Sequence, residues 1–198
     1  MPICYLNVND NHRQEDILVE TKLSVIKDFL ESFDLQVGLY KVDEEHSLEE
    51  VLVSIGQDLA QRSYFLQIRR FDKDMKQYVG EEMSPDPENG FSSLNFFMGV
   101  PFEFPEEKRD QICRLASIVN KMLPFQTFGV SEQEKHIYCQ YNYPFVTEEI
   151  HENILLGIIS SFIFAKDTFV QFFDDVATEK ATVDSLIQEA DKYMQKQE

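Results

Sequence analysis

The apolar stretch at residues 145–177, FVTEEIHENILLGIISSFIFAKDTFVQFFDDVA, decides the fold. Thr147 is a good N-cap for a helix, and Glu148 and Glu149 would lie in its first turn, where carboxylates complement the helix dipole. Apolar residues recur with helical spacing from Ile150 to Val176. This stripe is wider than one sheet face requires. We therefore expect the helix either to lie deep in the core or to pack against a second copy of the protein.

The sequence on either side of this helix predicts strands and three shorter helices. Helical spacing covers residues 20–33, 105–123 and 182–196; Pro105 suits a first helical turn, and Pro124 stops the second of these helices. Strand patterns cover residues 37–42, 51–56, 64–71, 94–104, 125–130 and 136–143. A helix over residues 48–60 competes with the strand at 51–56, and we favour the strand because β-branched residues are frequent there.

This order predicts an α+β fold, with an antiparallel, mostly meander sheet, helices packed on one of its faces and an extra C-terminal helix. We expect an N-terminal extension at residues 1–18, a single α+β domain at 19–178 and a C-terminal helix at 179–198. Residues 72–93 are highly charged and contain two prolines, so we expect a long loop that is either functional or mobile.

Composition excludes several classes of function. The formal net charge is -18, from 36 acidic and 18 basic residues, and such a field repels nucleic acid. Three cysteines without a Cys-x-x-Cys spacing indicate neither a disulfide framework nor a zinc site, which favours a reducing, cytoplasmic location. The apolar run 154–165 is shorter than the roughly 20 residues of a membrane span, so we expect no membrane insertion.

Signals for catalysis are weak. Glu148 and His151 have the Glu-x-x-His spacing of carboxylate-bridged metal sites, but such sites need a second copy of the motif, which the sequence lacks. There is no Gly-x-Ser-x-Gly nucleophile motif, and seven glycines form no phosphate-binding loop. The sequence therefore predicts a protein that is not an enzyme and has no metal or cofactor.

Large apolar side chains suggest a different activity, protein binding. The chain has more of them than one small sheet consumes, which favours an apolar groove for a partner segment. We expect the partner-binding residues at Phe96, Met98, Val100, Phe102, Ile158, Phe162, Phe169 and Phe173.

The order of elements also suggests a family. The pattern consists of a hairpin from Val51–Gly56 and Tyr64–Ile68, a strand Leu94–Phe104 before a helix with Leu115 and Asn120, strands Phe125–Val130 and His136–Tyr143, and a helix from Thr147 that contains Asp167. Over about residues 20–178 this resembles the YbjN-like family and the class I type III secretion chaperones, which share an α-β-β-β-α-β-β-α layout. The resemblance implies a non-enzymatic, commonly dimeric domain that is regulatory or holds the binding segment of a secreted protein.

These observations predict a protein-binding module that acts as a secretion-chaperone-like or regulatory adaptor, as a monomer or a homodimer. Two alternatives remain open. One is a small-molecule or metal-binding sensor or enzyme with a cavity between helix and sheet, and the other is a structural subunit of a larger assembly.

Overall fold

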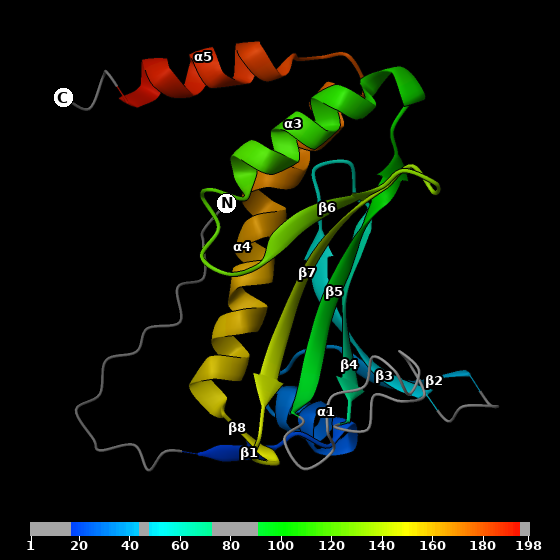
Figure 1. Ribbon diagram of the computed structural model, residues 1–198. Coiled ribbons are helices and arrows are strands. Elements are labelled where there is room, and N and C mark those ends of the chain that lie inside the picture. Colours follow the sequence, from blue (N-terminus) through cyan, green and yellow to red (C-terminus); the bar gives the residue numbers. More distant parts are fainter. Residues whose placement is uncertain (1–16, 44–47, 73–90, 195–198) are drawn as a thin grey trace.

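The computed structural model describes residues 17–43, 48–72 and 91–194, and its centre is a six-stranded antiparallel sheet (Figure 1). Its strands have the spatial order β2-β3-β4-β5-β7-β6. In chain order they are β2 (Val37–Asp43), β3 (Leu48–Gln57), β4 (Ser63–Phe71), β5 (Ser92–Glu103), β6 (Thr127–Ser131) and β7 (His136–Phe145). The first four form a meander and the last two a hairpin, which confirms the predicted α+β class with an antiparallel, mostly meander sheet.

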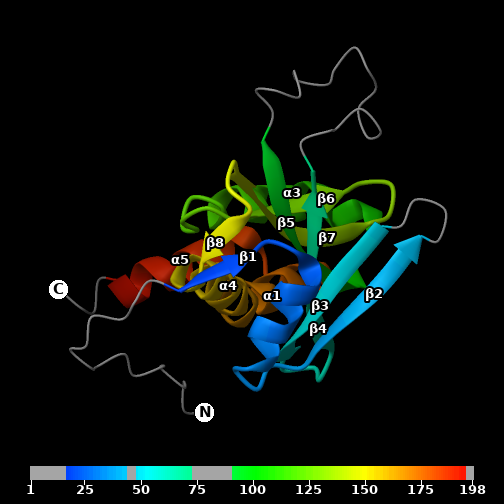
Figure 2. The same ribbon diagram turned by 90° about the horizontal axis from the view of Figure 1, so that it is seen from below.

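Helices pack along one face of this sheet (Figure 2). The helices of the described residues are α1 (Leu23–Glu31), the 3-10 turn η1 (Glu106–Lys108), α3 (Arg109–Val119), α4 (Glu152–Ala177) and α5 (Val183–Met194). The long helix α4 runs across the middle strands, α1 packs on β2 and β3, and α3 packs on α4 and β6. Helix α5 lies across α3 at the far end of the molecule (Figure 1).

Alternation along the strands separates the two faces of the sheet. Tyr64, Leu66 and Ile68 on β4 are at most 1% exposed, whereas Phe65, between the first two, is 49% exposed. Strand pairing carries this pattern across the sheet, because Ile68 lies opposite Phe96 of β5. The covered face thus contributes a continuous apolar layer, against which α4 buries Phe162 and Phe173. This layer and the buried side of α4 form the core.

The entry to α4 differs from the sequence prediction. Thr147 is not the N-cap, because residues Glu149–His151 form a short strand, β8, that pairs with β1 (Leu18–Glu20). Helix α4 therefore begins at Glu152, where the ring nitrogen Nδ1 of His151 accepts a hydrogen bond from the backbone N–H of Asn153. A strand partner about 130 residues earlier in the chain overrides the local capping signal.

One edge of the sheet is closed by a side chain. The Asn120 amide, at the end of α3, donates to the carbonyl oxygen of Phe128 and its own oxygen accepts from the Phe128 N–H, at 3.0 and 2.7 Å. Asn120 thereby takes the place of a neighbouring strand at the centre of β6. Such capping protects an edge from pairing with another chain.

Other details refine the predicted elements. The helix that competed for residues 48–60 is excluded, since Leu48–Gln57 forms strand β3. Strand β5 continues past Pro101 with an irregular register between Gly99 and Glu103. There are four strands between α1 and α3, one more than the layout of the resembled family. Most of the predicted 72–93 loop, and most of the proposed 1–18 extension, lie outside the described residues.

Candidate binding surfaces

The first candidate surface is the side of the sheet opposite the helices, which we call the open face. No helix in the described ranges packs against it. It consists of the outward residues in the middle of the six strands: Gly38, Tyr40, Glu50, Leu52, Ser54, Phe65, Gln67, Arg69, Asn95, Phe97, Gly99, Thr127, Gly129, Tyr138, Gln140 and Asn142. Apart from the buried Glu50, all of them are half-buried or exposed.

Charge is almost absent from the open face. Its two charged residues, Arg69 and Glu50, neutralise each other. Nε and Nη2 of Arg69 both donate to Oε2 of Glu50, at 2.9 and 2.7 Å. The remaining polar residues carry amides and hydroxyls. The side-chain amide of Asn95 on β5 donates to the side-chain oxygen of Asn142 on the neighbouring strand β7 at 2.7 Å. The open face therefore carries almost no net charge, although the chain as a whole has a net charge of -18.

Aromatic rings lie flat on the open face. The rings of Phe97 and Tyr138 are stacked, with centroids 5.5 Å apart and an interplanar angle of 22°. The ring of Tyr138 covers Gly129 so closely that a Cβ at that position would overlap it. The missing side chain of Gly129 therefore allows the ring to lie against the backbone of β6. Phe65 and Tyr40, 49% and 54% exposed, lie on the same face, and we call these four aromatic side chains the aromatic platform.

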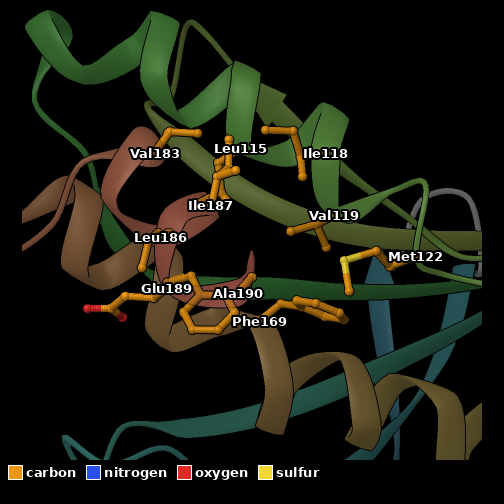
Figure 3. Close-up of a pocket in the computed structure, with 11 residues that line it drawn as sticks. Leu115, Ile118, Val119, Met122, Phe169, Val183, Leu186, Ile187, Glu189 and Ala190 are labelled. Carbon is orange, nitrogen blue, oxygen red and sulfur yellow. The ribbon is translucent and has the colours of Figure 1, made fainter. Parts of the chain in front are cut away.

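The second candidate surface is an apolar pocket of about 240 Å³ between α3, α4 and α5, which we call the α5 pocket (Figure 3). Its lining residues are Leu115, Ile118, Val119 and Met122 of α3 and the turn after it, Phe169 and Phe172 of α4, and Val183, Leu186, Ile187, Glu189 and Ala190 of α5. Glu189 is the one polar member, and its carboxylate points away from the other side chains (Figure 3). The pocket exists because α5 crosses α3 without filling the groove between α3 and α4.

A polar cluster on the covered side ties the β3–β4 turn to α4. Arg62 donates to Asp58 at 2.6 Å and to Asp174 at 2.8 Å, while its guanidinium lies 4.4 Å from the centre of the Phe102 ring. Burial raises the pKa of Asp58, but hydrogen bonds from the backbone and side chain of Arg62 and from Tyr64 outweigh it and lower that pKa. Because each charged group has its partners within the cluster, we assign it a structural role.

The structure places the predicted partner-binding residues mostly inside the protein. Seven of them are at most 3% exposed: Phe96, Met98, Val100, Ile158, Phe162, Phe169 and Phe173. Phe102 is partly buried beneath Arg62. A side chain so deeply buried contacts a partner only if the fold opens, so we assign these residues to the core. Among the eight, Phe169 also reaches a surface cavity, as part of the α5 pocket.

Glu148 and His151 have other partners than a metal. Arg70 donates to Glu148 at 2.6 Å, and His151 caps α4. Within the described ranges, no group of three or more histidine, cysteine, aspartate or glutamate side chains is arranged to hold a metal ion.

Helix α4 is the one described helix that is long and apolar enough to cross a bilayer. It also buries three charged side chains, Glu152, Lys166 and Asp174, beside the apolar ones that face the sheet. Asp174 accepts from Arg62, and Lys166 is 2.8 Å from Asp167. These contacts fit the central helix of a folded domain, and we assign α4 to the core.

In comparisons with known proteins, no model of a protein family matches the chain, and no curated protein matches it. The resemblance to the YbjN-like family and the class I type III secretion chaperones therefore rests on the order of elements and stays a prediction.

Sequence reasoning missed the open face because it searched for large apolar side chains. A different signal marks this surface. Residues 91–102, 123–131 and 137–147 contain no charged residue, although 27% of the chain is charged. A stretch of 12 residues would carry about three charges at that frequency. The three stretches include β6, β5 as far as Phe102 and β7 from Ile137, and these strands are adjacent in the sheet.

Proposed function

We propose that this protein is a non-enzymatic protein-binding module, a chaperone-like or regulatory adaptor, and that it binds its partner through the open face. The observation that carries the proposal is the combination of aromatic rings and near-absence of net charge on that face of a strongly acidic chain. The centres of protein–protein interfaces are depleted in charge and enriched in aromatic residues. A solvated sheet face without a partner normally presents polar side chains, and the exposed aromatic rings of the open face depart from that pattern.

The size of the open face suits a protein partner. Six strands about 4.8 Å apart span roughly 24 Å, and strands of nine or ten residues at about 3.3 Å per residue span roughly 30 Å. Standard interfaces cover about 800 Å² on each partner, which is close to this extent. The surface offers amide donors and acceptors from Gln67, Asn95, Gln140 and Asn142 between its rings. It therefore supports recognition of a flat or extended protein surface.

The negative charge of the chain restricts which surfaces of two proteins can meet. Two copies of the protein, or this protein and another acidic one, repel each other where acidic surfaces meet. The open face is free of that repulsion, because Glu50 is paired with Arg69. A second copy of the chain is consequently one partner to test, through a two-fold contact in which the same face serves both subunits.

A charge placed on the platform tests the proposal. Phe65→Glu puts a carboxylate in the open face at a side chain that is 49% exposed, so the fold should remain stable to within about 0.5 kcal/mol. Phe33→Glu, at a residue 44% exposed near α1, is the matched control. The measurement is the mass in solution by light scattering, together with stoichiometric capture of a partner from a native lysate by each variant.

The expected result is a dimer or a captured partner with the original protein and with Phe33→Glu, and its loss with Phe65→Glu. Burial of an unpaired charge in the centre of an interface costs several kcal/mol, enough to abolish binding. Retention of the dimer or partner by Phe65→Glu would place the interface elsewhere. A strictly monomeric protein that captures nothing in any form would contradict the proposal altogether.

A further inference from the structure

The α5 pocket is a separate feature, remote from the open face, and its three walls come from three different helices. Val183 is buried, whereas Leu186 and Ile187 are half-buried and Ala190 is exposed. Opposite them lie Phe169 of α4 and the apolar side of α3 (Figure 3). Phe172 of α4 also lines the pocket. A helix that docks on a groove and leaves about 240 Å³ beneath it forgoes the contacts that tight packing would provide.

From this geometry we propose that the α5 pocket binds a small, uncharged, apolar molecule of about the size of two fused aromatic rings or a medium-length alkyl chain. The volume sets the size. An apolar cavity of about 150 Å³ in another protein accommodates benzene. The α5 pocket, at about 240 Å³, is larger by the volume of several further carbon atoms.

The lining sets the polarity of the ligand. A water molecule inside a protein needs two to four polar partners, and this pocket offers one polar side chain, Glu189, at its rim. Water is therefore a poor occupant, and a ligand that hydrogen-bonds through several groups would lose those bonds on entry. Apolar groups gain by the transfer.

Charge around the pocket excludes an anionic headgroup. Glu189 lies at the rim, and the two ion pairs that fasten α5 and its preceding turn already use their cations: Arg114 with Asp184 at 2.7 Å and Lys108 with Glu179 at 2.8 Å. A ligand carboxylate would meet a chain of net charge -18 without either of these cations to bind it. An alcohol or an arene of the same size avoids this cost.

Ligand binding has a structural consequence for α5. This helix is attached mainly through Val183, through the half-buried Leu186 and Ile187, and through the Arg114–Asp184 ion pair. A molecule in the pocket would touch α3, α4 and α5 at once and add to these contacts. Occupancy should therefore slow hydrogen exchange of the α5 amides, since local opening of α5 would also require loss of the ligand.

The experiment titrates the full-length protein with 1-aminonaphthalene, a neutral bicyclic probe whose emission shifts to shorter wavelength in apolar surroundings. We expect saturable binding of one probe per chain. Ala190→Phe places a ring into the pocket from α5 and should weaken binding at least tenfold. Gln188→Phe adds the same ring to an exposed position of the same helix outside the pocket lining, and should leave binding unchanged.

Competition then tests the ligand class. Decanol should displace the probe, and decanoate should do so at least tenfold less effectively. Equal displacement by decanoate would overturn the assignment to uncharged ligands. Absence of saturable binding, or equal binding by Ala190→Phe, would overturn the site itself, and the thermal midpoint of each variant shows whether it is folded.

Two further outcomes separate this proposal from the proposed function. The Phe65→Glu variant should bind the probe normally, because the open face is on the other side of the sheet; loss of probe binding there would place the probe on the open face instead. A dimer that dissociates as the probe binds would show that a second copy occupies the α5 pocket. Either result would overturn the proposal.

Discussion

The two faces of the six-stranded sheet are built from alternate residues of the same strands, yet they differ in what their aromatic residues do. On the covered face Phe96 is completely buried and contacts Phe162 of α4, with ring centroids 6.4 Å apart. On the open face its neighbour Phe97 is stacked against Tyr138, and none of the described helices packs above it. Burial in the core explains the first ring but not the second. An aromatic residue that the core does not require points to a function at the surface.

The largest expected effect comes from truncating this adjacent pair of phenylalanines. Phe96→Ala should lower the free energy of unfolding by about 3–5 kcal/mol, because it leaves a cavity between β5 and α4. Phe97→Ala should lower it by about 1 kcal/mol, the contribution of the stacked contact with Tyr138. Urea denaturation monitored by circular dichroism measures both values.

Equal losses in the free energy of unfolding for Phe96→Ala and Phe97→Ala would contradict this difference between the two faces. A large loss for Phe97→Ala would mean that the open face is covered in solution, either by a second copy or by part of the chain. Repeating the measurement at several protein concentrations distinguishes these cases, since stability that depends on dimerisation rises with concentration.

A second prediction concerns the polar cluster on the covered side. Asp58 accepts from Arg62 and Tyr64 and from two backbone N–H groups, those of Ala60 and Arg62. Asp58→Asn removes the charge and should lower the free energy of unfolding by about 1–3 kcal/mol at pH 7. Thermal or urea unfolding of both proteins across pH 2–7 measures the difference.

The sign of the pH dependence follows from the lowered pKa of Asp58. Folding favours the ionised carboxylate, so its contribution is complete above the unfolded pKa of about 4 and is lost as the pH falls through the lower folded value. The difference between the original protein and Asp58→Asn should therefore shrink below about pH 4. A difference that stays constant down to pH 2 would show that the cost of the variant comes from packing and not from charge.

Much of the fold could be predicted from residues that are close in sequence. The strand pattern at residues 64–71 predicted β4, and helical spacing located α3 and α4. The start of α4 could not be predicted this way. Thr147 and two glutamates satisfy every local rule for a helix N-terminus, but pairing of β8 with β1 involves residues that the local sequence does not reveal.

The candidate surfaces were harder to predict, for a physical reason. Selecting the largest apolar side chains selects residues that a core requires, and Phe96, Phe162 and Phe173 are indeed buried. The uncharged stretches mark three strands of the open face, but only the strand order shows that these strands are adjacent and which other residues share their face. The α5 pocket depends on the angle at which α5 crosses α3, and no pattern in residues 182–196 specifies that angle.

The smallest expected effect tests whether the platform on the open face is organised. Gly129→Ala introduces a methyl group beneath the ring of Tyr138 and should displace that ring from Phe97. The lost stacking, about 0.5–1.5 kcal/mol, is partly offset by the reduced chain entropy of alanine in the unfolded state, about 0.4–1 kcal/mol. The net change should therefore be under about 1 kcal/mol.

A double-mutant cycle with Tyr138→Ala extracts the coupling between the two positions. Without the ring, Gly129→Ala should be neutral or slightly stabilising, which gives a coupling energy of about 1 kcal/mol. If Gly129→Ala has the same effect in both backgrounds, the ring does not rest on β6 and the platform is a collection of independent side chains. A measurable coupling would instead mean that the open face holds its rings in place before any partner arrives, which lowers the entropy lost on binding.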